Sequence, residues 1–183
     1  MINLTNNVMN NKIYLILLIG CTMFYSCDNN DFEHENSFKN SYKKWSEFKT
    51  KSNNSYEYTT ESSSWTGLKW ETSITVNNGE VVQRSFKYTY IANELKENFE
   101  GELEWVENKE ELNTHKNTRA SAPLTLDEIY IKAEQDWLRK GKGFTTYLET
   151  ENDGLISRCG FWPDNCQDDC FTGINIIQIE KLE

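Results

Sequence analysis

The sequence predicts an α+β fold for the chain after residue 36, with two amphipathic helices packed on an antiparallel sheet. Apolar residues recur at helical spacing in two segments, and each segment is followed by stretches in which apolar and polar residues alternate. Turn-forming residues separate these stretches. The order is one helix and three or four strands, then one helix and three strands. We therefore expect a helix-plus-meander unit arranged twice.

The first helix is predicted over residues 37–49. Phe38, Tyr42, Trp45 and Phe48 follow one another at spacings of four, three and three, and polar residues fill the opposite face. Apolar residues of this spacing form one stripe, which we expect to pack on the sheet.

A β-hairpin over residues 69–91 is predicted next. Alternation from Trp70 to Val76 leads into Asn77-Asn78-Gly79, a sequence that tolerates the positive φ angles of a tight turn. A short strand is expected near Leu103–Val106. The charged stretch from Glu107 to Arg119 is expected to form an exposed loop.

The second helix is predicted to begin at Thr125, because Thr125-Leu126-Asp127-Glu128 has the pattern of a capping box. Gly141 suits its C-terminal cap. Three strands are expected to follow, over residues 144–149, 155–161 and 174–182.

The N-terminus has the pattern of a signal peptide over residues 1–26. Lys12 precedes an apolar run that begins at Ile13, is too short to span a bilayer, and ends where the chain turns abruptly polar after Cys27. We expect residues 27–36 to form an acidic tether and residues 37–183 to form a single domain.

Two cysteines are candidate lipid acceptors. Cys27 stands at the end of the apolar run and directly before the acidic tether, whereas Cys21 follows Leu18-Ile19-Gly20, which matches the usual lipobox more closely. We favour Cys27, with Cys21 as the alternative. Palmitate or similar acyl chains on this cysteine would anchor the protein stably in a lipid bilayer.

The sequence Ser26-Cys27-Asp28-Asn29 resembles the start of mature lipoproteins of the Bacteroidetes type. The resemblance implies an outer-membrane anchor, with the domain on the periplasmic face or at the cell surface.

A second resemblance covers roughly residues 45–179. It is carried by Trp45, by Tyr56-Glu57-Tyr58, by the stretch from Ile74 to Val82, by Leu124 to Tyr130, by Gly154 to Ser157, and by Asp168-Asp169 before Gly173-Ile174. This order is similar to that of the bacterial family called domain of unknown function 6174. Members of this family are small secreted or lipid-anchored proteins. The resemblance implies an α+β fold but no site, because the family has no established activity.

Composition excludes one class of partner. The net charge is −10, and every acidic residue follows position 27. A domain with this charge repels nucleic acid, so we expect no nucleic-acid partner.

Three cysteines of the domain, Cys159, Cys166 and Cys170, lie in one short segment. An exported domain meets an oxidising compartment, so a disulfide is expected there. All three pairings are open from the sequence, with a slight preference for Cys159–Cys170.

The segment does not contain the complete ligand set of a familiar metal site. Zinc would require more thiolate or imidazole ligands than this segment supplies. Asp164, Asn165, Asp168 and Asp169 offer oxygen ligands for calcium, but they do not follow the EF-hand pattern. They are kept as weak calcium candidates.

No familiar catalytic motif occurs, so no catalytic residue and no cofactor are assigned and the protein is expected not to be an enzyme. Trp65 and Trp162 have loop-like surroundings and are weak candidates for stacking on a ligand. The favoured function is binding of an envelope or surface protein, or a structural role in the envelope. A glycan- or calcium-binding surface module is the alternative, and a small secreted enzyme is less favoured.

Overall fold

The computed structural model describes residues 32–183. The predicted signal peptide and both candidate lipid acceptors, Cys21 and Cys27, therefore lie outside the described residues. Phe32 is already buried, and the first described helix begins at Glu35. Folded structure thus extends into the stretch interpreted above as the end of the tether.

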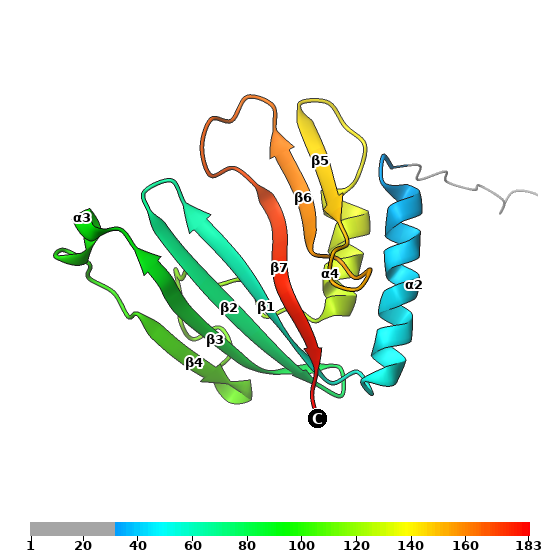
Figure 1. The fold of residues 1–183 in the computed structure, drawn as a ribbon, viewed down its shortest axis with the longest axis horizontal. Coiled ribbons are helices and arrows are strands. Elements are labelled where there is room, and N and C mark those ends of the chain that lie inside the picture. Colours follow the sequence, from blue (N-terminus) through cyan, green and yellow to red (C-terminus); the bar gives the residue numbers. More distant parts are fainter. Residues whose placement is uncertain (1–31) are drawn as a thin grey trace, which may run out of the picture. The chain divides into compact units, whose positions relative to one another are not determined.

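The first half of the domain is a helix followed by four antiparallel strands (Figure 1). The elements are α2 (Glu35–Lys51), β1 (Tyr56–Ser64), β2 (Leu68–Asn77), β3 (Glu80–Ile91) and β4 (Glu104–Asn108), with a short helix α3 (Asn93–Lys96) between β3 and β4. The predicted hairpin is confirmed as β2 and β3, with Asn77 opposite Glu80 and Asn78 at positive φ in the turn.

The second half repeats the plan with three strands. It consists of α4 (Leu126–Lys132), β5 (Phe144–Glu149), β6 (Arg158–Pro163) and β7 (Thr172–Lys181). The strand order is β4-β3-β2-β1-β7-β6-β5, and every neighbouring pair is antiparallel. Pairing of β1 with β7 joins the two halves into one sheet. The predicted α+β fold is confirmed.

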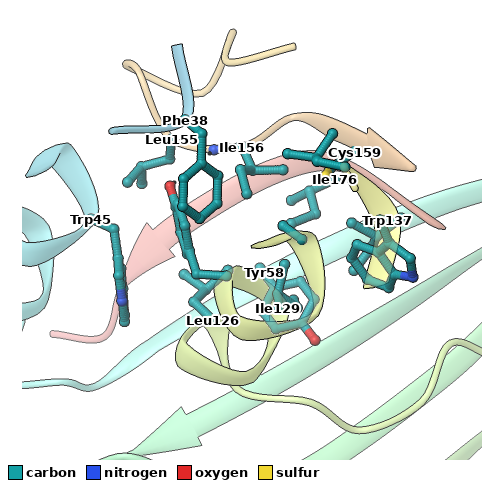
Figure 2. Packing of buried hydrophobic residues seen from close by; sticks show 14 of the residues in the cluster. Phe38, Trp45, Tyr58, Leu126, Ile129, Trp137, Leu155, Ile156, Cys159 and Ile176 are labelled. Carbon is teal, nitrogen blue, oxygen red and sulfur yellow. Dashed lines mark hydrogen bonds between the residues drawn. The ribbon is translucent and has the colours of Figure 1, made fainter. Parts of the chain in front are cut away.

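The main core lies between the two helices and one face of the sheet, which we call the helix face (Figure 2). Trp45 of α2 stacks on Tyr130 of α4, with 6.2 Å between the ring centroids, and meets Tyr56 of β1 edge-on at 5.4 Å. Burying such rings removes large apolar areas from water and supplies most of the driving force for folding.

Side-chain hydrogen bonds fasten the start of α4 to the sheet. The Tyr56 hydroxyl accepts a bond of 2.7 Å from the Leu126 N–H, and the Tyr58 hydroxyl donates one of 2.6 Å to the Leu124 carbonyl. From the other side, the Trp45 indole donates to a carboxylate oxygen of Asp127 at 2.9 Å. One orphan N–H of the first helical turn, that of Leu126, is thus satisfied within the protein.

A second, smaller core lies on the helix face of β2, β3 and β4. It contains Leu68, Trp70, Phe86 and Trp105. Phe99, from the β3–β4 connection, and Ala120, from the β4–α4 connection, pack against it. We call residues 109–121 the strap, because this segment leads from β4 back across the second core.

Three sequence expectations need correction. Helix α4 continues only through a π-helical turn to Trp137, so Gly141 is not its cap. Strand β6 begins at Arg158, whereas residues 155–157 are buried outside any strand. Glu107 is a fully buried residue of β4 and not part of an exposed loop. Its charge can be buried because neighbouring groups donate hydrogen bonds to its carboxylate.

Candidate binding cleft

The sheet splits between β1 and β7. Their pairing runs from Tyr56 opposite Lys181 to Thr60 opposite Ile176 and then stops. Beyond this point β1 continues beside β2 alone, and β7 continues beside β6 alone. In Figure 1 the two strands lie together near the C-terminus and diverge towards the opposite end.

A bulge and a pair of glycines redirect β7. The register shifts between Thr59 and Thr60, which is the irregularity that bends a strand and changes its direction. Gly173 of β7 stands opposite Gly160 of β6, and a Cβ atom on Gly173 would collide with the carbonyl of Cys159. Strands β6 and β7 approach closely here, so β7 follows β6 away from β1.

A cleft of about 660 Å³ occupies the split. This volume lies within the range of about 300–1,000 Å³ that is typical of ligand pockets. Its walls come from β1, β2, the strap, β6, the β6–β7 connection and β7, and they combine aromatic rings with charged and hydroxyl groups.

Only some of the backbone N–H and carbonyl groups on the edge of β1 within the cleft have hydrogen-bond partners. The Glu61 carbonyl accepts a 3.2 Å hydrogen bond from the Asn175 amide, and the Trp65 N–H donates one of 3.1 Å to an Asp169 carboxylate oxygen. Successive residues of a strand direct their peptide groups to alternate neighbours. Ser63 therefore also directs its N–H and carbonyl towards the cleft, where the β1–β7 ladder has already ended.

Two arginines line the cleft from opposite faces of the sheet. The Arg119 guanidinium, from the strap, lies 5.2 Å from the centroid of Trp70 on the helix face. Arg158 precedes the core-facing Cys159 in β6, so its side chain emerges on the outer face, where it lies 4.8 Å from the Phe171 ring. Stacking on rings holds both guanidinium groups while their N–H donors stay available.

The two arginines of the cleft differ in their ion-pair partners. Arg158 has one distant carboxylate partner, since its Nη1 lies 3.8 Å from Glu149 Oε1. Arg119 forms no ion pair with any residue in the described range 32–183. The carboxylates of Glu61 and Asp169 also line the cleft, and Asp169 accepts the Trp65 N–H. The cleft therefore offers cationic donors on both faces of its opening.

The two candidate tryptophans lie at this end of the sheet. Trp162 is a half-buried residue of β6 and not of a loop; it lines the cleft, 6.4 Å from the Phe171 ring. Trp65 lies in the β1–β2 turn with 75% of its surface exposed, and its N–H reaches Asp169 at the cleft. Both tryptophans are candidates from the sequence alone, whereas Arg119, Arg158 and Phe171 are not. No local sequence pattern indicates that the sheet splits between β1 and β7.

The disulfide joins Cys166 to Cys170 in the β6–β7 connection, beside the cleft residues Asp169 and Phe171. The slight preference for Cys159–Cys170 is wrong. Cys159 points into the main core from β6, where it is fully buried and free. Burial raises the pKa of its thiol to about 12, so the reactive thiolate is scarce at neutral pH.

The four weak calcium candidates do not form a site. Asp164 accepts a 3.4 Å hydrogen bond from the Thr145 hydroxyl, whereas Asp169 faces the β1–β2 turn. Asn165 and Asp168 are exposed. Across residues 32–183, no three acidic, cysteine or histidine side chains are arranged to hold a metal ion.

A second polar cluster holds the strap in place. The fully buried Glu107 carboxylate accepts hydrogen bonds from Arg84 Nε at 2.9 Å and from the backbone N–H groups of Asn113 and His115 at 2.9 and 2.7 Å. The His115 ring stacks on Trp105, with 4.2 Å between centroids, and its Nδ1 lies 3.0 Å from Glu107. All of these contacts attach the strap to β3 and β4.

Burial of Glu107 by itself raises the pKa of its carboxyl group. The hydrogen bonds from the His115 and Asn113 backbone, the His115 ring and Arg84 outweigh burial and lower this pKa to about 2. Glu107 is therefore a fixed anion at neutral pH. We assign it to holding the strap, and hence Arg119, over Trp70.

Comparisons of this chain with protein-family models, with curated proteins and with solved structures found no match. The resemblance to the domain of unknown function 6174 family therefore stays a prediction. Among residues 32–183, no helix combines the length and apolar character needed to cross a membrane.

Proposed function

We propose that the protein is an exported lipoprotein, anchored in the outer membrane through acyl chains on Cys27, whose domain binds an envelope or surface component without catalysing a reaction. The signal-peptide pattern of residues 1–26 and the acidic stretch after Cys27 support the anchor. The Cys166–Cys170 disulfide is consistent with the oxidising compartment that an exported domain enters. Cys21 remains the alternative acceptor.

The observation that carries the binding function is the cleft in the split of the sheet. Ligand sites are concave, contain apolar walls and display a few polar groups that fix the orientation of the ligand. Here Trp70, Trp162 and Phe171 supply rings, and Arg119 and Arg158 supply donors.

Site-specific photocrosslinking in intact cells tests this function. Trp65, which is exposed and whose N–H reaches Asp169 of the cleft, is replaced by a photoreactive benzoylphenylalanine. Tyr42 on α2, which is also exposed, is replaced in the same way as a matched control. We expect a discrete adduct from position 65 alone. We also expect this adduct to weaken when Arg119→Gln and Arg158→Gln are introduced together. Equal adducts from both positions, or none from position 65, would contradict a binding role for the cleft.

A glycan ligand is the second candidate. Trp162 and the carboxylate of Asp169 both line the cleft, and Asp169 accepts the backbone N–H of the exposed Trp65. Aromatic rings with nearby polar groups suit sugar recognition. A panel of immobilised oligosaccharides tests it. Binding that is lost in Trp162→Ala but kept in Trp137→Phe, a conservative change in the core, would support this candidate.

A further inference from the structure

The cleft has the backbone pattern of a sheet from which one short strand is missing. Asn175 and Asp169 bind peptide groups of β1 on either side of Ser63 with their side chains, in the positions that a neighbouring strand would serve. Between them the Ser63 N–H and carbonyl face the cleft. A partner that offers a peptide group of its own would complete this edge.

The two arginines match the alternation of an extended chain. Successive side chains of a strand point to opposite faces of the sheet. A strand lying beside Ser63 would therefore direct one side chain towards Arg119 on the helix face and the next towards Arg158 on the outer face. Carboxylates are the side chains that a guanidinium group recognises best, through charge-assisted and often bidentate hydrogen bonds.

We propose that the cleft binds an extended acidic peptide segment, which pairs as a short added strand with Ser63 and places adjacent carboxylates against Arg119 and Arg158. This inference rests on the proposed function and names the chemistry of the partner. Hydrogen bonds to the backbone of Ser63 provide the attachment, and the two arginines select the sequence. Trp70 and Phe171, under the guanidinium groups, exclude water from the ion pairs.

Selection from a library of short random peptides tests the inference. The bait is the full mature protein, purified from membranes in detergent and immobilised. We expect the selected peptides to contain two adjacent Asp or Glu residues flanked by residues with high strand propensity. Selected peptides without adjacent acidic residues would overturn the inference.

Variants of the protein then locate the contact. Binding of a synthetic selected peptide is expected to weaken about tenfold in Arg119→Gln and about tenfold in Arg158→Gln, because each loses a charge-assisted hydrogen bond. Arg139→Gln is the matched control, since Arg139 is exposed and does not line the cleft. Arg158→Glu is expected to bind a peptide in which one acidic residue is replaced by Lys. Equal affinity of all variants for the original peptide would contradict the assignment.

Variants of the peptide test the strand pairing. N-methylation of the peptide bond that faces Ser63 removes one donor, and we expect about a fivefold or greater loss of affinity. A methyl scan along the peptide should show the loss at the one position that pairs with Ser63, and little change at the positions on either side. Equal affinity of all N-methylated peptides would show that the peptide backbone does not hydrogen-bond to Ser63.

The failure of this inference can be distinguished from failure of the proposed function. If oligosaccharides bind and no peptide is selected, the cleft is a binding site but not for a strand. If neither binds and position 65 gives no adduct in cells, the proposed function fails as well.

Discussion

Glu107 shows how a single buried charge can organise a surface segment. Its carboxylate joins β4 to Arg84 on β3 and to two backbone N–H groups of the strap. Removing one member of such a buried set leaves the others uncompensated, which costs far more than the loss of an exposed ion pair.

We predict that Glu107→Gln lowers the free energy of unfolding by about 3 kcal/mol at neutral pH, because the buried Arg84 loses its counter-charge. Urea denaturation of the purified protein measures this change. Glu104→Gln, an exposed position on the same strand, is the control and should leave the stability almost unchanged. A similarly small effect of both substitutions would show that the Glu107 cluster does not contribute more to the free energy of unfolding than an exposed carboxylate does.

Acid stability should depend on the same residue. The folded-state pKa of Glu107, about 2, lies below its ordinary value of 4.5. The stability it contributes is therefore fully present above pH 4.5 and is lost as the pH falls towards 2. We expect the urea midpoint of the wild type to fall more steeply over this interval than that of Glu107→Gln. Parallel curves would contradict the assigned pKa.

Cys159 should resist modification in the folded protein. Burial both blocks access and raises the pKa of its thiol to about 12. Alkylation with iodoacetamide at neutral pH, followed by peptide mass analysis, should label Cys159 only after denaturation. Rapid labelling of the native protein would show that β6 does not bury this side chain.

Among the elements, α4 depends most clearly on its first turn. The Thr125 hydroxyl accepts the Glu128 N–H at 3.2 Å, and the Glu128 carboxylate accepts the Thr125 N–H at 2.7 Å. The predicted capping box is thus confirmed, and it sets the helix against Tyr56 and Tyr58.

Thr125→Ala should lower the free energy of unfolding by about 1 kcal/mol, the usual cost of losing a capping hydroxyl. Thr125→Ser keeps that hydroxyl and should retain most of the stability. Thermal or urea denaturation of the two variants provides the comparison. A loss in Thr125→Ser as large as in Thr125→Ala would attribute the effect to the methyl group instead of the cap.

Elements specified by nearby residues could be predicted from the sequence. The Asn77-Asn78-Gly79 turn and the Thr125 cap each depend on a few consecutive residues, and both were predicted correctly. Pairing of β1 with β7 joins residues more than a hundred positions apart, and the bulge at Thr60 leaves no local signal. The cleft and its arginines follow from that pairing, so they could not be predicted. Glu107 was misread for the same reason, since its partner Arg84 lies on another strand.

At the scale of the whole domain, the β1–β7 pairing makes the two halves interdependent. The main core contains Trp45 and Tyr56 from the first half and Tyr130 and Ile176 from the second. Neither half would bury these side chains alone, so we expect them to unfold in one step.

Native-state hydrogen exchange tests this interdependence. Slowly exchanging amides near Tyr58 on β1 and near Ile176 on β7 should report the same free energy of opening, because breaking their pairing opens the common core. A lower value confined to β5, β6 and β7 would show that the second half opens as a separate unit.

We propose that acyl chains on Cys27 hold a folded, disulfide-containing domain at the membrane. The most direct test is the intact mass of the mature protein from membranes, denatured and alkylated with and without reduction. We predict an acylated N-terminus at Cys27, one alkylated cysteine before reduction, Cys159, and two more, Cys166 and Cys170, after it. An N-terminus without lipid would contradict the anchor, and three alkylated cysteines without reduction would contradict the disulfide.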